Sequence, residues 1–188
     1  HALLPDGTPL VHHPEPIAFE AALPAARAAI DGTLSAVETL FEAIRIGAAP
    51  VLAPVGAAVD ELAAAMIANP DAPMWLARMR SELPRPIRHA LAVSLYLMAL
   101  GRSIGLQSDG LSRLGLTGLL ADAGKARLPR ALLEKPGMLS PAEHTVVKEH
   151  VRLGLEALAR GGDLPNEIVQ GIAQHHERLD GSGYPKGL

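Results

Sequence analysis

The sequence predicts an all-α protein, and three observations favour that fold class. Of the 188 residues, 48% are hydrophobic but only 3% are aromatic. The core must therefore be built from Ala, Leu, Val and Ile, which suits closely packed helices. Apolar residues recur at helical spacing in several segments, and no segment shows the alternation typical of a strand. Prolines and glycines separate these segments from one another.

The first part of the chain predicts a tail followed by a helical region. Residues 1–26 are rich in proline and lack periodicity, so we expect a linker or tail. The three histidines of this tail are expected to be exposed and inert: His1, His12 and His13. Residues 27–83 predict a helical region with helices over 27–46, over 54–68 and around 74–79. The sequence of these helices shows no group of polar residues that could form a functional site. This indicates a role in packing or dimerisation.

Residues 84–188 predict a second helical domain. Its helices are expected over 87–104, 108–122, 141–159 and 165–178. Gly124 and Pro129 mark a loop after the second of these helices. Ser140 and Glu143 have the spacing of a capping box, with a proline at the first helical position, so the third helix has a well-defined start.

Composition and charge exclude several classes of protein. The net charge is −3, without a large block of one sign, which argues against a protein that binds duplex nucleic acid. Cysteine is absent, so disulfides and thiolate metal sites are excluded. No apolar run reaches the ~20 residues of a membrane span, and no signal peptide is visible. The chain begins with His1 rather than Met, which suggests a fragment.

Several residues that can bind metals lie at apolar positions of the predicted helices. His150 and His89 both have apolar neighbours at helical spacing, so each is expected to point inward and to need a partner. For His150 alone, a hydrogen bond to a backbone carbonyl is an equal alternative to a metal. Asp122 ends an apolar helix, where a metal or a lysine partner is expected. His144 lies in the first turn of its helix and is expected at the surface.

The last fourteen residues contain the densest polar cluster, HHERLDGSGYPKGL. Imidazole and carboxylate groups are ligands for transition metals, and the glycines and proline force a turn directly after them. This stretch matches every fixed position of the pattern HHExxDGxGYP. The chain therefore resembles the HD-GYP phosphodiesterases, a branch of the HD metal-hydrolase superfamily. The resemblance extends upstream to about Arg88 and, more loosely, to Arg27.

The resemblance implies an HD-superfamily helical bundle, over residues 84–188, that follows the N-terminal helical region. It implies hydrolysis of cyclic di-GMP at two or three divalent metal ions, which could be Fe, Mn, Zn or Ni. The implied metal ligands are His89, Asp122, His150, His175 and His176. Asp122 and Lys125 are the implied catalytic residues. The implied substrate or docking loop contains Gly181, Gly183, Tyr184 and Pro185. A cytoplasmic location is also expected.

Two departures from the family pattern leave two functions open. Ala121 stands where the HD dipeptide has its histidine, and the chain stops at Leu188, where family members continue and supply another aspartate. One hypothesis is a cyclic di-GMP phosphodiesterase with a reduced metal set. The alternative is a non-catalytic sensor or docking module that binds nucleotide, or a diguanylate cyclase domain through the Gly-Tyr-Pro loop. A homodimer is a further candidate, because the C-terminally incomplete domain is expected to expose apolar surface.

Overall fold

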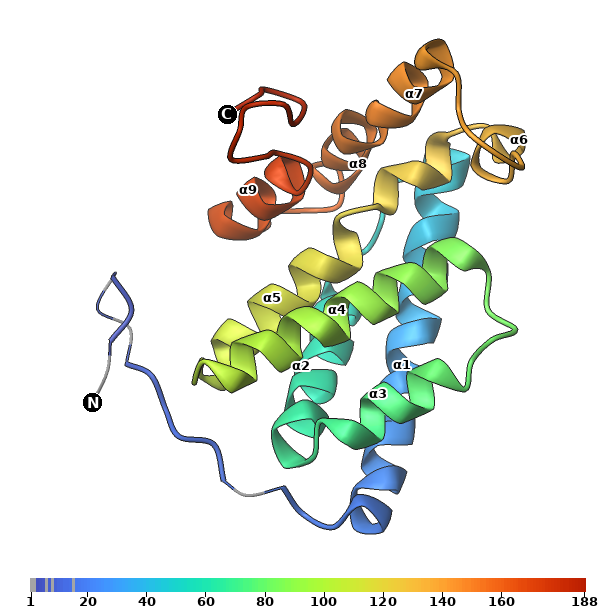
Figure 1. Cartoon of the computed structure of the whole chain (residues 1–188). Helices are drawn as coiled ribbons and strands as arrows, with labels where there is room; N and C mark the ends of the chain where they lie inside the picture. Colours follow the sequence, from blue (N-terminus) through green and yellow to red (C-terminus); the bar gives the residue numbers. More distant parts are fainter. Residues whose placement is uncertain (1–2, 6, 8, 15) are drawn as a thin grey trace. The chain divides into compact units, whose positions relative to one another are not determined.

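The computed structural model describes residues 3–5, 7, 9–14 and 16–188, so His1 lies outside the described residues. Within these residues every regular element is a helix, and one isolated β-bridge pairs Leu3 with Pro9 (Figure 1). The all-α prediction is confirmed. None of the helices in the described part of the chain has both the length and the apolar character needed to cross a bilayer.

Contacts between residues divide the chain into two compact units. The first comprises the chain up to Glu38 together with Ala53–Leu119, and the second comprises Thr39–Leu52 together with Leu120–Leu188. The domain boundaries predicted from the sequence, at residues 26 and 83, stay a prediction.

The first unit is built from helices that pack through small residues. It contains α1 (Phe19–Ile46) as far as Glu38, and then α2 (Ala53–Ala68), α3 (Asp71–Arg78), α4 (Arg85–Ser103) and α5 (Ser108–Leu120). A Cβ on Gly118 would lie 2.9 Å from the backbone nitrogen of Ser94. A Cβ on Gly115 would collide with the Met98 side chain. These glycines therefore allow α5 to approach α4 closely.

The N-terminal tail is shorter than predicted, and it contacts the segment that follows α4. Helix α1 begins at Phe19 rather than at residue 27, and Pro24 lies inside it. Proline removes only one backbone hydrogen bond near the helix start, and the burial of Ala22 and Ala26 favours the helical conformation on both sides of it. His13, expected to be inert, lies with Nε2 2.7 Å from the carbonyl oxygen of Leu106.

The second unit is centred on α8 (His150–Leu158), which contacts three neighbouring elements. These are η1 (Ala123–Arg127, a 3-10 helix), α7 (Pro141–Lys148) and α9 (Asn166–Gln174). The short α6 (Arg130–Leu133) follows η1 (Figure 1). Gly124 of η1 packs directly on α8, because a Cβ there would meet the backbone of His150 and would lie 2.5 Å from the nitrogen of Gly154.

Two helix boundaries and one loop in this unit differ from the sequence prediction. The helix expected over 141–159 is divided at Glu149 into α7 and α8. The last helix ends at Gln174 rather than at residue 178, so His175 and His176 follow it in a turn. The segment at Gly124, expected to be a loop, forms η1. Helical periodicity therefore located the segments of α7, α8 and α9 but did not reveal where the backbone turns, and it gave no sign of η1.

The capping box at the start of α7 is confirmed, and it should contribute measurably to stability. The Ser140 side chain accepts a hydrogen bond from the Glu143 backbone nitrogen at 3.3 Å, and the Glu143 carboxylate accepts one from the Ser140 nitrogen at 2.7 Å. We expect Ser140→Ala to lower the free energy of unfolding by about 1 kcal/mol. Urea denaturation measures this loss. Ser81→Ala, an exposed serine in a turn, is the control, and an equal effect of both changes would contradict the capping role.

Candidate metal centre

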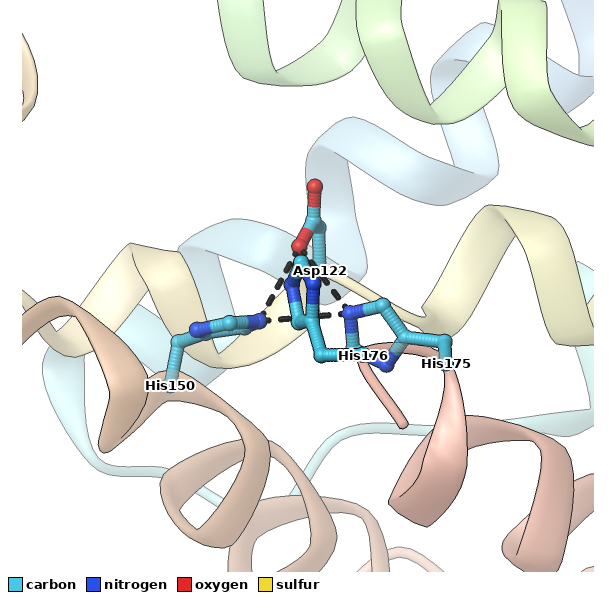
Figure 2. Close-up of side chains that lie close together, drawn as sticks. All are labelled: Asp122, His150, His175 and His176. Atoms are coloured by element: carbon cyan, nitrogen blue, oxygen red, sulfur yellow. Dashed lines mark hydrogen bonds and ion pairs between the residues drawn. The ribbon is translucent and has the colours of Figure 1, made fainter. Parts of the chain in front are cut away.

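The structure brings four of the predicted site residues together in the second unit. Asp122 precedes η1, His150 is the first residue of α8, and His175 and His176 follow the last residue of α9. One ligand atom from each residue lies within 4.8 Å of the others. Figure 2 shows the carboxylate and the imidazole rings converging from these separate elements. We call these four residues the His-Asp cluster.

The two histidines at helix ends are fixed in the tautomer that suits a metal ligand. His150 Nδ1 lies 2.6 Å from the Val147 carbonyl oxygen, and His175 Nδ1 lies 2.8 Å from that of Ile172. A carbonyl oxygen only accepts hydrogen bonds, so each Nδ1 must carry the proton and donate it. In the neutral rings, each Nε2 therefore presents a lone pair.

These lone pairs face one another and one carboxylate oxygen. The two Nε2 atoms are 3.3 Å apart, and they lie 3.2 Å (His150) and 3.6 Å (His175) from Asp122 Oδ1 (Figure 2). Three acceptors at this separation repel one another unless a cation or a proton lies between them. Histidines whose Nδ1 groups are held by backbone carbonyls are the usual form of metal-binding imidazoles.

Asp122 is held between this cluster and a lysine. Its Oδ2 accepts a hydrogen bond from Lys125 Nζ at 2.7 Å, one turn further along the chain. Burial raises the pKa of the Asp122 carboxyl, but hydrogen bonds with His150, His175 and Lys125 outweigh burial and hold the pKa well below its usual range. The carboxylate is therefore ionised at neutral pH, as a metal ligand must be.

His176 presents a buried nitrogen that needs a partner. Its Nε2 has no hydrogen-bond partner among the described residues. Burial, reinforced by the neighbouring His175 and His150, lowers the pKa of His176 to about 4, so the ring is neutral at pH 7. An unsatisfied buried polar atom is costly, and a metal ion would satisfy it. Three imidazoles and one carboxylate thus fit a divalent transition metal.

The polar residues of the terminal motif that do not join the cluster fold the loop after it. Glu177 accepts hydrogen bonds from the backbone nitrogens of Lys186 at 2.7 Å and Leu188 at 3.0 Å. Asp180 accepts one from the Ser182 nitrogen at 3.0 Å. Gly183 must be glycine, since a Cβ there would lie 2.6 Å from the His176 carbonyl oxygen. Gly181 has a positive φ of 72°.

The loop returns Tyr184 to the cluster. The Tyr184 nitrogen donates to the His176 carbonyl oxygen at 3.1 Å. Its ring stacks on the His176 ring, with centroids 4.4 Å apart and an interplanar angle of 19°. Pro185 follows through a cis peptide bond. The predicted loop residue Tyr184 therefore supports His176, a contact that sequence spacing alone did not reveal.

We expect Tyr184→Leu to weaken metal binding by about tenfold, in the range typical of residues that orient metal ligands. The physical reason is that His176 loses the flat surface that fixes its ring. Competition with a chelating dye measures the affinity. Tyr184→Phe keeps the stacking ring and should remain close to the wild type, whereas an equal loss in both variants would contradict this role.

His89 and His144 do not belong to the His-Asp cluster. His89 lies on α4 in the first unit and is exposed, so the prediction that it points inward is wrong. The buried face of α4 is instead formed by Ile87, Ala90, Leu91, Ser94, Leu95, Met98 and Gly101. His144 is exposed, as predicted, and its ring centroid lies 6.4 Å from that of Tyr184.

A pocket of about 440 Å³ lies beside His175, His176 and Tyr184. Two basic residues that the sequence reasoning missed, Lys148 and Arg178, also line this pocket. Lys148 Nζ lies 4.9 Å from the centre of the Tyr184 ring. Their positions in the sequence could have identified these two basic residues, because each lies two residues from a histidine of the cluster.

The all-helical fold and the His-Asp cluster together define a helical protein with a candidate metal centre. Consistent with this class, the family model described as HD domain matches residues 74–188, well over half of the chain. The chain therefore belongs to the HD-domain family, and the predicted resemblance to the HD-GYP branch is confirmed by the relatives that it matches.

These relatives are bacterial cyclic dinucleotide phosphodiesterases. A cyclic di-GMP phosphodiesterase of Pseudomonas aeruginosa is 33% identical over 187 residues, which cover 100% of this chain and 45% of that protein. One from Thermotoga maritima is 34% identical over 54% of this chain and 28% of its own length. A 3'3'-cGAMP-specific phosphodiesterase of Vibrio cholerae is 36% identical over 53% of this chain and 19% of its own length. No solved structure shows a significant match to the chain.

Proposed function

We propose that this protein is a metal-dependent phosphodiesterase that hydrolyses cyclic di-GMP in bacterial signalling. The observation that carries the proposal is the His-Asp cluster, in which two tautomer-fixed histidines and Asp122 direct acceptor atoms at one point. The names of the relatives supply the substrate. The chain spans 45% of the length of the Pseudomonas aeruginosa relative, so the substrate is part of the proposal.

The residues of the second unit have separable roles in this reaction. A divalent metal ion bound by Asp122, His150, His175 and His176 would activate a water molecule and neutralise charge on the phosphodiester. Lys125 directs the Asp122 carboxylate by holding its Oδ2. Tyr184 fixes the His176 ring by stacking.

The pocket beside the cluster has the charge that a phosphodiester requires. Lys148 and Arg178 place positive charge around the 440 Å³ space that the two adjacent histidines also line. Arginine and lysine both pair with phosphate oxygens, and Tyr184 offers an aromatic face on which a base can stack. We propose that the phosphates and one guanine base of the substrate enter here, between the loop and α7.

The test combines metal analysis with turnover. The purified protein is assayed by elemental analysis and then incubated with cyclic di-GMP, and the linear dinucleotide is separated chromatographically. We expect bound Fe, Mn, Zn or Ni, because the nitrogen and oxygen donors suit any of these ions, and we expect hydrolysis that a chelator stops. The cyclic GMP-AMP dinucleotide serves as the competing substrate. Protein that is folded and metal-loaded but inactive on both substrates would exclude the enzymatic proposal.

One observation favours the alternative of a non-catalytic sensor or docking module. Ala121, at the position of the first residue of the HD dipeptide, is buried and offers no ligand atom. Under this alternative the protein would bind nucleotide or metal without turnover. The loop around Tyr184 would then contact a diguanylate cyclase domain. The cytoplasmic location, a homodimer and a metal-binding role for His89 all stay predictions.

Ala121→His distinguishes a missing ligand from a docking role. We expect the added imidazole to raise metal content and the hydrolysis rate, because it restores a second ligand beside Asp122. The cost is overpacking of a site shaped around alanine, about 1–3 kcal/mol. Elemental analysis and turnover of the folded variant measure the outcome. If a folded variant gains neither metal nor rate, the alanine does not limit the site and the docking role is favoured.

A further inference from the structure

The first unit contains a groove that is separate from the His-Asp cluster, although His89 is among its lining residues. It has a volume of about 870 Å³ and is lined by α3, α4 and the first residue of α1. Its lining includes three arginines and three large apolar side chains: Arg78, Arg85, Arg88, Trp75, Met79 and Tyr96. No residue of the His-Asp cluster lines it. Its size lies within the range of small-molecule sites, roughly 300–1,000 Å³.

The groove carries an excess of positive charge that the chain does not neutralise. Arg78 and Arg85 form no hydrogen bond or ion pair within the described part of the chain, and Arg88 only donates through Nη1 to the Ser81 carbonyl oxygen at 2.9 Å. Asp71 is the one acid of the lining. By contrast, surface arginines such as Arg152 form ion pairs at 2.6–2.8 Å. Concentrated positive charge in a concave surface attracts anions.

The same groove exposes large flat or flexible apolar side chains. Trp75 is 46% exposed, Met79 61% and Tyr96 59%. The Trp75 ring is held in place by an edge contact with Phe19, with centroids 5.8 Å apart at 84°. A fixed, half-exposed indole offers a face on which a planar ring can stack, and aromatic faces stack on nucleobases regardless of sequence. The ligand should therefore combine anionic groups with a planar ring.

We propose that this groove is a second binding site for a cyclic dinucleotide. Its two phosphates would pair with Arg78 and Arg85, whose planar guanidinium groups match phosphate oxygens, and one base would stack on Trp75. A ligand with two negative charges complements three arginines and one aspartate. The choice of a cyclic dinucleotide as the ligand rests on the proposed function, whereas the anionic and planar character of the ligand rests on the groove alone.

The chain provides its own reporter for this site, because Trp75 is its single tryptophan. Cyclic di-GMP is titrated into the chelated protein while tryptophan fluorescence is recorded, and circular dichroism confirms that the helices persist. The titration is repeated with metal-loaded protein. We expect saturable quenching in both states. The double variant Arg78→Gln/Arg85→Gln should bind at least about tenfold more weakly, the loss typical of charge-assisted hydrogen bonds. Arg27→Gln, an exposed arginine on α1 outside the groove, is the matched control.

The possible outcomes separate the ligand classes. Undiminished binding by the double variant, or the absence of quenching in both states, would overturn the proposal. Binding of inorganic phosphate with the same affinity would indicate a simple anion site and would also overturn the proposal. Quenching by an acidic peptide, but not by the dinucleotide, would overturn it as well. Quenching that persists while the metal-loaded protein shows no hydrolysis would reject the proposed enzymatic function and leave the groove site supported.

Discussion

Asp122→Asn is expected to abolish stable metal binding and to lower the proposed hydrolysis of cyclic di-GMP by about a hundredfold. The carboxylate directs Oδ1 at His150 and His175 and holds Lys125 through Oδ2. Asparagine keeps the volume but loses the charge, and its amide cannot supply two acceptor oxygens. Elemental analysis and turnover measure the two effects, while circular dichroism verifies the fold.

The matched control for this change is Asp163→Asn, because Asp163 lies exposed in the loop between α8 and α9. Its metal content and turnover should equal those of the wild type. If Asp122→Asn retained both full metal content and full turnover, the His-Asp cluster would not be the metal centre. Retained metal with lost turnover would instead assign Asp122 to the chemical step alone.

Gly124→Ala is expected to destabilise the protein by about 3 kcal/mol and to lower metal affinity at the same time. The added methyl group would meet the backbone of His150 and Gly154, which cannot rotate away as a side chain can. Helix η1 must then move off α8 and carry Asp122, which directly precedes it, away from His150. Urea denaturation and metal competition measure the two losses.

Gly56→Ala is the appropriate comparison, since Gly56 lies within α2 and a Cβ there meets nothing within 4 Å. Alanine at an open helical position usually stabilises a helix by about 0.5–1 kcal/mol. The two glycine variants should therefore shift the unfolding midpoint in opposite directions. A fully stable Gly124→Ala variant with unchanged metal affinity would show that η1 does not position Asp122.

The sequence singled out Asp122 and His150 because burial and polarity conflict at those positions, whereas His175 and His176 were implied by the resemblance of the terminal motif. Asp122 follows an apolar helix and His150 interrupts an apolar face, and both are buried. His89 seemed to satisfy the same criterion, but its neighbours Ala92, Val93 and Tyr96 are only half-buried or exposed. Two apolar stripes cross α4, and periodicity alone does not tell which of them faces the core.

Local chain geometry was the part that the sequence left open. Helical spacing extended α9 to residue 178, whereas it ends at Gln174, so the paired histidines lie in a turn and not on one helical face. The roles of Glu177 and Tyr184 depend on backbone hydrogen bonds and ring stacking across the loop. Such contacts form between residues whose separation in the chain carries no periodic signal.

The closure of the terminal loop by Glu177 has a thermodynamic consequence. The carboxylate next to the paired histidines holds the amides of Lys186 and Leu188, and the loop between them returns Tyr184 to His176. The ordering of this loop and the orientation of the His176 ring are therefore one cooperative event. An ion captured by His176 would be linked to that order–disorder equilibrium. Its observed affinity would then report the conformational entropy of the loop as well as the strength of the coordination bonds.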